Sequence, residues 1–430
     1  MTIHTVKPGE TVTSIAALYS VPPERIIADN FLSSPDTLSP GQALIILFPA
    51  ITYTVRKGDT LNSIANRFGV TLMSLWQNNP LLDGESYIIP GQVINILYTE
   101  PKMGRIVTTG FAYPETDTQT LKRTLPYLSR LNVFTYGISE NGSLIPTNDS
   151  TLLELAKEYK TSPILVLSSR TEEGTFNAER MRNILDDDVK RDRLTDEILN
   201  TVKSKGYDGV EADFEYLGDN YAEKYASFIS ELNKRLESEG YILTVDLAPK
   251  TSDNQPGSLY SGIDYEELGE AAQNSFLMTY EWGYRYSEPM AISPEDKVRD
   301  VVEYAVEKID SEKILLGIPN YGYVWKLPYV EGESVAQSLS NTEAVQIANE
   351  FGSIIEYNEA EASPHYTFSL ESNNEKADYE VWFEDARTVK GAMELIMDYG
   401  MLGMGVWNIR RYFPQLWAIV NSMYEIIKNE

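Results

Sequence analysis

Residues 208–215 read Asp-Gly-Val-Glu-Ala-Asp-Phe-Glu, with acidic side chains at every second position from 211 onward. Because side chains alternate between the two faces of a β-strand, Glu211, Asp213 and Glu215 point to the same side. Carboxyl groups about 7 Å apart in a low-dielectric interior are hard to ionise together, so at least one keeps its proton above its ordinary pKa. Such a carboxyl serves as a general acid near neutral pH, whereas an ordinary acidic strand end is the less favoured interpretation.

From about residue 104 onward, apolar segments on both sides of this stretch alternate with helical ones, which is typical of a parallel sheet covered by helices. The expected strands are 106–111, 133–136, 164–167, 209–214, 243–247, 276–279, 314–318 and 402–407. Eight such strands close a (β/α)8 barrel, an α/β fold whose chemistry lies at the carboxyl ends of the strands. The alternation in 366–368 and 379–383 predicts a small α+β insertion, at about 323–383, beside the barrel mouth.

Aromatic side chains follow two of the other predicted strands. The sixth ends Met278-Thr-Tyr280-Glu281-Trp282, and the eighth ends Gly405-Val-Trp407. Either aromatic alone is more often part of a core, but together with the acidic stretch they favour a site in which a sugar ring lies on an apolar plate.

A repeat occupies the N-terminal part of the chain. The segment His4-Thr-Val-Lys-Pro-Gly9-Glu-Thr-Val-Thr-Ser14-Ile-Ala16 recurs as Tyr53-Thr-Val-Arg-Lys-Gly58-Asp-Thr-Leu-Asn-Ser63-Ile-Ala65, and Pro40-Gly41-Gln42 recurs as Pro90-Gly91-Gln92. Each unit predicts strand, helix, helix and strand, with a threonine as the first helix N-cap. We therefore expect domains at 1–49, 50–98 and 99–430. Units this small bury little surface, which suits binding better than catalysis.

The repeats resemble LysM domains through the openings just quoted, through Asn30 and Asn79 at the end of the second helix, and through the Pro-Gly-Gln before the last strand. The resemblance implies a shallow groove for N-acetylglucosamine units, between the loop after the first strand and the loop before the last. The candidate glycan-binding residues are Gly9, Glu10, Thr11, Gly58, Asp59 and Thr60. A repeat used only for packing is the alternative.

Residues 104–430 resemble glycoside hydrolase family 18. The motifs that carry the resemblance are the acidic strand 208–215, the Met-x-Tyr strand end at 278–281, Gly317-Ile-Pro-Asn-Tyr-Gly322 after the seventh strand, and Trp407. By this resemblance Glu215 protonates the glycosidic oxygen, Asp213 and Tyr280 hold the substrate acetamido group, and Trp407 forms the floor of the subsite. The acetamido oxygen is then the nucleophile, and configuration is retained. The remaining expected substrate-binding residues are Asp208, Glu281, Trp282, Tyr321 and Tyr136.

The sequence departs from the family pattern at Glu211 and Glu281, where the family has aspartate. By the resemblance, Glu211 helps Asp213 to change orientation, so the longer side chain could alter the rate or the pH optimum. Since Glu215 and Asp213 are present, we expect an active enzyme.

Composition excludes several classes of partner. The net charge is −28, and residues 1–98 contribute only 5 of the 36 Lys+Arg and 7 of the 64 Asp+Glu, so the surplus lies in the larger domain. A surface this acidic repels nucleic acid and anionic membranes. The chain has no cysteine and two histidines, so we expect no metal and no other cofactor.

Substrate assistance needs an N-acetyl sugar, and LysM domains select the same sugar, so chitin and peptidoglycan are the candidate polymers. The domain arrangement resembles spore cortex-lytic N-acetylglucosaminidases. Because no signal peptide is evident, we expect a protein made in the mother cell and placed at the boundary of spore coat and cortex. We also expect a monomer. A chitinase, a phage-type lysin and a non-catalytic glycan-binding coat protein are the alternatives.

Overall fold

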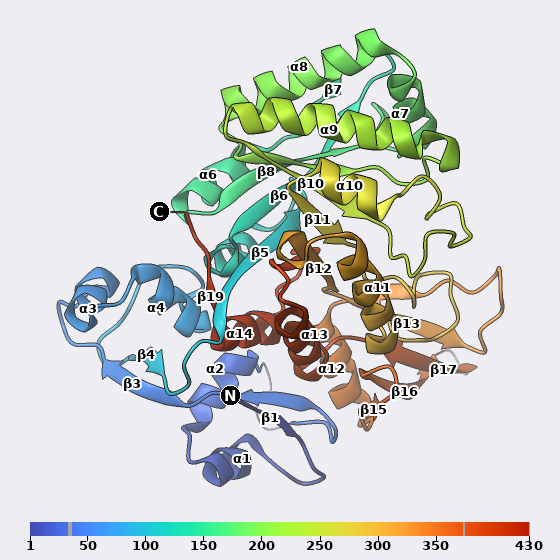
Figure 1. Cartoon of the computed structure of the whole chain (residues 1–430). Coiled ribbons are helices and arrows are strands. Elements are labelled where there is room, and N and C mark those ends of the chain that lie inside the picture. Colours follow the sequence, from blue (N-terminus) through green and yellow to red (C-terminus); the bar gives the residue numbers. More distant parts are fainter. Residues whose placement is uncertain (33–36, 373–374, 430) are drawn as a thin grey trace.

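Eight parallel strands form a closed barrel in the computed structural model, which describes residues 1–32, 37–372 and 375–429 (Figure 1). Chain order is also the order around the ring, and the last strand pairs with the first. The strands are β5 Gly104–Ala112, β6 Arg130–Ile138, β8 Ser162–Ser168, β9 Gly209–Asp213, β10 Ile242–Leu247, β11 Asn274–Leu277, β12 Ile314–Pro319 and β18 Gly403–Trp407. Each overlaps a strand predicted from the sequence, so the predicted barrel is confirmed.

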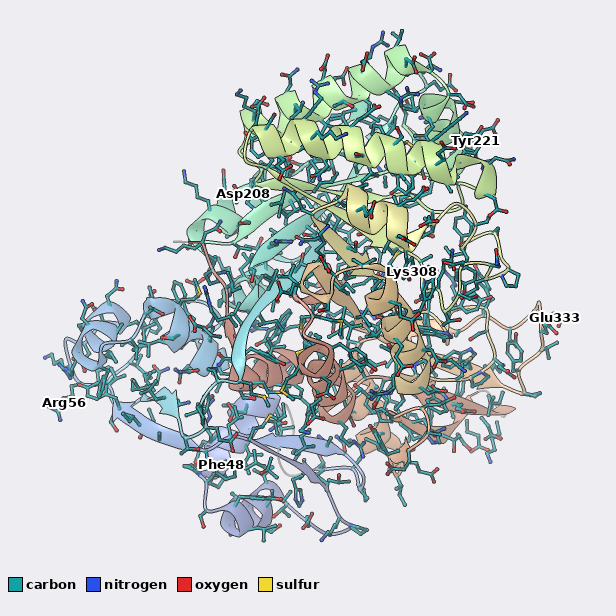
Figure 2. All side chains as sticks on the ribbon, in the orientation of Figure 1. Phe48, Arg56, Asp208, Tyr221, Lys308 and Glu333 are labelled. Atoms are coloured by element: carbon teal, nitrogen blue, oxygen red, sulfur yellow. The ribbon has the colours of Figure 1, made fainter. Side chains whose placement is uncertain are left out.

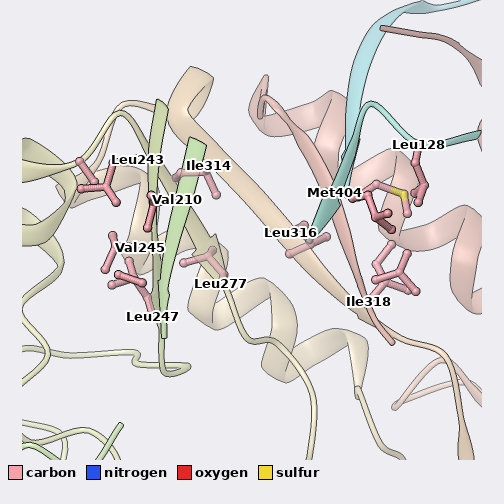
Figure 3. Close-up of a cluster of buried hydrophobic side chains, with 14 of the residues drawn as sticks. Leu128, Val210, Leu243, Val245, Leu247, Leu277, Ile314, Leu316, Ile318 and Met404 are labelled. Atoms are coloured by element: carbon pink, nitrogen blue, oxygen red, sulfur yellow. The ribbon is translucent and has the colours of Figure 1, made fainter. Parts of the chain in front are cut away.

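Helices surround the barrel and cover the apolar face of each strand. They are α5 Thr118–Thr124, α6 Ser150–Glu158, α7 Ala178–Leu185, α8 Asp188–Lys205, α9 Ala222–Ser238, α10 Tyr265–Ala271, α11 Glu295–Lys308, α13 Ala386–Tyr399 and α14 Pro414–Met423. Val210, Leu243, Val245 and Leu247 lie in the buried layer between strands and helices (Figure 3). Their neighbours in sequence therefore point into the barrel, which places Glu211 inside it.

A second sheet rises beside the barrel between β12 and α13. Its strands are β13 Gly322–Leu327, β14 Gln337–Leu339, β15 Glu356–Asn358, β16 Ser363–Ser372 and β17 Glu375–Trp382, all antiparallel, and α12 Asn341–Phe351 packs on it. Two short strands extend the barrel sheet, β7 Leu144–Ile145 beside β6 and β19 Tyr424–Ile426 beside β5. The predicted α+β insertion is therefore present.

Both N-terminal repeats fold as predicted. The first consists of β1 Thr2–Thr5, α1 Val12–Tyr19, α2 Pro23–Asn30 and β2 Ala43–Ile46, and the second of β3 Pro49–Thr54, α3 Leu61–Phe68, α4 Leu72–Asn78 and β4 Val93–Tyr98. Thr11 and Thr60 are the helix N-caps: their hydroxyls accept hydrogen bonds from the amides of Ser14 and Ser63.

The two repeats pack directly against the barrel. Helices α2 and α4 contact the last barrel helix, α14, at the lower left of Figure 1. Ala43, Ile45 and Leu47 of the first repeat belong to the same buried apolar cluster as the barrel strands. Within the described ranges, no helix is both long enough and apolar enough to cross a membrane.

Candidate active site

A pocket of about 430 Å³ opens at the carboxyl ends of the barrel strands. Seven of the eight strands or the loops that follow them contribute side chains to its wall. These are Phe111, Tyr113, Phe134, Ser169, Phe176, Ala178, Asp213, Glu215, Tyr216, Asp246, Met278, Tyr280, Glu281 and Trp407. Half of these residues are aromatic, and the four carboxyl groups come from β9 and the loop after it, from β10 and from the loop after β11.

The acidic side chains of residues 208–215 form a column that leads from the barrel interior to this pocket. Glu211 is deepest, only 2% exposed, and accepts a hydrogen bond from the side-chain amide of Asn132 on β6. Asp213 and Glu215 lie above it and line the pocket. In the adjoining strand, Asp246 lies next to this column and shares a hydrogen bond with Glu211.

Burial raises the pKa of every carboxyl group in this cluster. It raises the pKa of Glu211 to about 7 and raises the pKa of Glu215. The pKa of Asp213 rises well above its ordinary value because of burial and then of the nearby Glu215 and Glu211 carboxylates. Asp246 has a pKa raised well above the ordinary value, by burial and then by Glu211 and Asp213. The cluster therefore holds protons near neutral pH, and Glu215 can donate one into the pocket.

Tyr280, after β11, and Trp407, at the end of β18, add two aromatic side chains to the wall. Burial and then the carboxylates Asp246, Asp213 and Glu215 raise the pKa of Tyr280 well above its usual range, so its hydroxyl remains a donor. The Trp407 indole packs edge-on against Phe134 and Phe111, with ring centroids 4.9 and 5.3 Å apart. These contacts fix the indole plane, so that it can serve as a platform for a sugar ring.

Glu281 and Tyr321 extend the site toward the insertion sheet. The hydroxyl of Tyr321 donates a hydrogen bond to the Glu281 carboxylate, and the hydroxyl of Tyr323 donates a second, at 3.1 Å. Burial nevertheless raises the pKa of Glu281. Glu281 lines the pocket, whereas Tyr321 supports it from behind. Trp282, half-buried beside them, does not line the pocket.

Two of the residues expected to bind substrate lie elsewhere. Asp208 is exposed at the amino end of β9, at the opposite end of the barrel, where it accepts a hydrogen bond from Asn429 (Figure 2). Tyr136 points out of the barrel, and its hydroxyl bonds to Asp149 at 2.5 Å. Asp208 precedes the predicted strand and has the parity of Val210, not of Glu211, so only the family motif had suggested that it binds substrate.

The side chains expected to bind glycan in the repeats have structural partners. Glu10 accepts hydrogen bonds from the Lys7 amide at 2.8 Å and from His4, and Asp59 accepts from Tyr53 and the Arg56 amide. The hydrogen bond from the Lys7 amide, and then the one from His4, lower the pKa of Glu10. These side chains therefore build the loop.

Thr11 and Thr60 cap helices, and Gly9 and Gly58 take the positive φ angles of the turn, 83° and 94°. Contacts from this loop to a glycan would come mainly from its backbone.

Sequence reasoning missed Asp246, Asn132 and the aromatic residues Phe134 and Tyr216. The signal for Asp246 was present, because Leu243-Thr-Val-Asp-Leu247 places polar side chains on the face opposite to its apolar ones, as residues 208–215 do. In the part of the chain that the structure describes, no three His, Asp or Glu side chains are grouped as a metal ion requires.

Comparison with known proteins gives matches to family models, to a related sequence and to solved structures. Residues 173–411 match the sequence model of Glycosyl hydrolases family 18, and residues 4–47 and 53–97 match the LysM domain. The chain is 33% identical to the cortical fragment-lytic enzyme of Bacillus anthracis, over 99% of both chains. Crystal structures of the spore cortex-lytic enzyme SleL are also similar. That of Bacillus megaterium has a TM-score of 0.82 and 33% identity over 99% of this chain and 98% of that one. That of Bacillus cereus has a TM-score of 0.83 and 32% identity, over 100% and 99%.

Proposed function

Because the chain belongs to glycosyl hydrolase family 18, we propose that it is an N-acetylglucosaminidase that cleaves the β-1,4 bond after N-acetylglucosamine in spore-cortex peptidoglycan. One observation carries the proposal. Glu215, Asp213 and Tyr280 line a single pocket whose wall includes Trp407. A proton donor, an acceptor for an amide N–H and a phenolic donor thus surround one space of sugar size.

The proposed reaction uses the substrate's own acetamido group. Glu215 donates its proton to the glycosidic oxygen while the acetamido oxygen attacks the anomeric carbon, so that the bond to the leaving sugar breaks as the new C–O bond forms. Asp213 accepts a hydrogen bond from the acetamido N–H and thereby favours this attack, and Tyr280 donates to the same group. Water, deprotonated by Glu215, then opens the cyclic intermediate. Each of the two steps inverts the configuration at the anomeric carbon, so the overall reaction retains it.

This mechanism determines which bond is cut. In cortex many muramic residues are lactams, which have no N-acetyl group and cannot assist the reaction. The sugar on the non-reducing side of the scissile bond must therefore be N-acetylglucosamine. The two LysM domains favour the same polymer, and the relatives named for spore cortex lysis favour the spore coat and cortex boundary as the place of action.

Mass spectrometry of digested spore cortex tests the proposal. The unaltered protein should leave N-acetylglucosamine at the new reducing ends, and Glu215→Gln should leave none. Muramic reducing ends would contradict the assignment. Parallel digests of intact peptidoglycan and chitin oligomers separate the alternatives: cleavage of chitin alone indicates a chitinase, cleavage of vegetative peptidoglycan a lysin, and binding without products a coat protein.

A further inference from the structure

The two repeats build the loop before their last strand in the same way. In the first repeat the Gln42 side chain accepts a hydrogen bond from the Ser39 amide at 3.2 Å, and in the second Gln92 accepts from the Ile89 amide at 3.0 Å. The glycine between them has a positive φ in both, 84° at Gly41 and 92° at Gly91. The internal geometry therefore does not distinguish the two loops.

In the first repeat the catalytic domain covers the turn at residues 39–41. The Ile355 amide donates to the Pro40 carbonyl at 2.9 Å, and the Ser39 hydroxyl donates to the Asn349 side chain at 2.7 Å. A Cβ atom on Gly41 would lie 1.8 Å from the Ile355 carbonyl oxygen, so the two backbones are in direct contact. A sugar chain has no access to this face of the turn.

In the second repeat the corresponding loop is open. Apart from the residues on either side of Gly91, no described atom lies within 4 Å of a Cβ placed on this glycine. Tyr87 is 79% exposed and Ile89 is 51% exposed, and they replace Thr37 and Ser39 of the first repeat. This repeat attaches to the barrel through residues just before the loop, with Asp83 paired to Arg123. Its docking therefore leaves residues 86–93 uncovered.

We propose that the two repeats have different tasks and that only the second binds the glycan strand, through residues 86–93, here named the open loop. The first repeat instead has a structural role, packed against the catalytic domain. The inference rests on the proposed function for the identity of the polymer, a strand containing N-acetylglucosamine. It assigns the two copies of one motif to different tasks.

The chemistry of the open loop suits an uncharged sugar strand. Residues 86–93 contain no charged side chain in a protein of net charge −28, and Tyr87 presents an exposed ring on which a sugar face can stack. The Gly91 amide donates to the Val55 carbonyl at 2.9 Å, which places the open loop beside the exposed turn at Gly58. The two loops of this repeat are thus neighbours, and both are exposed.

The test uses the full-length protein with Glu215→Gln, so that the polymer is not digested, and measures retention on chitin beads and on purified cortex. Adding Tyr87→Ala and Ile89→Ala should weaken retention about tenfold, the loss of roughly one aromatic stacking contact. Thr37→Ala at the matched position of the first repeat should leave retention unchanged. Thermal melting verifies that each variant is folded.

The inference would be overturned if the Tyr87 and Ile89 variant were retained as strongly as the Glu215→Gln parent, or if Thr37→Ala weakened retention. Failure of the parent protein to bind either polymer would also overturn it. Sedimentation adds a further outcome: a dimer that Tyr87→Ala dissociates would show that the open loop binds a second copy instead. Hydrolysis of soluble cortex fragments by the unaltered protein is measured separately, so that the proposed function can stand while this inference fails.

Discussion

Two cavities of similar size differ in almost every respect that concerns chemistry. The pocket at the barrel mouth measures about 430 Å³, and a cavity of about 410 Å³ lies between the first repeat, α12 and α14. Each contains a buried carboxyl group with a raised pKa. Burial raises the pKa of Glu384, in the second cavity, to about 8.

The difference lies in what surrounds each carboxyl group. Glu215 has Asp213, Asp246 and Tyr280 in the same wall, all from the ends of parallel strands. Glu384 shares its cavity with the amides of Asn341 and Gln415 and with the Asp385 carboxyl group, and the described lining residues include no tyrosine or tryptophan. A raised pKa therefore reports burial, whereas catalysis needs several groups that converge on one bond.

The largest expected effect is on the rate of cortex hydrolysis, and it should distinguish Glu215 from Glu384. We expect Glu215→Gln to lower the rate of cortex hydrolysis by about 10²–10⁴-fold, because an amide cannot donate the proton that a general acid supplies. Glu384→Gln, the matched change, should leave the rate unaltered. Release of reducing ends measures both rates. A comparable loss of rate in the two variants would show that the two glutamates do not differ in the reaction.

A smaller loss is expected at Asp213. Asp213→Asn keeps the shape of the side chain but removes the negative charge that favours attack by the acetamido oxygen, so the turnover rate should fall roughly 10²-fold. The fall should appear in the turnover rate more than in KM, which steady-state kinetics on soluble cortex fragments would separate. Undiminished turnover would show that Asp213 does not take part in the reaction.

The carboxyl column also predicts a change in the pH profile. The Glu211 carboxylate raises the pKa of Asp213, so Glu211→Gln should lower that pKa and move the acid limb of kcat/KM to lower pH, by about one unit or less. Glu211→Asp retains the charge, so its acid limb should move less than that of the glutamine variant. An unmoved limb in the glutamine variant would show that the two groups are not coupled.

The smallest effect concerns stability. The pKa of Glu384 is raised in the folded protein, so its contribution to stability is present below the ordinary glutamate pKa and is lost as pH rises toward 8. Glu384→Gln removes this loss. Its Tm should exceed that of the unaltered protein by about 1–3 °C at pH 8 and match it near pH 4. A pH-independent difference would contradict the assignment.

The barrel and most of its site could be predicted from local patterns. Alternation places Glu211 and Val210 on opposite faces, and counting strands gives the barrel. Asp246 obeys the same rule and was overlooked. Tyr136 points outward because β6 has a register shift between Val133 and Tyr136, which reverses the alternation and which the local pattern does not show. The contact between Gly41 and Ile355 joins residues more than 300 positions apart, and nothing in the repeat itself indicates it.

Shared packing of the repeats and α14 has a practical consequence for anyone who shortens this chain. Ala43, Ile45 and Leu47 complete a core whose other members come from the barrel, and α2 and α4 rest on the last barrel helix. A truncated protein that starts at residue 99 would leave that helix bare to water, and it should aggregate or lose solubility before any question of glycan targeting arises. The last strand of the second repeat ends at Tyr98, but the buried core continues from the repeats into the barrel.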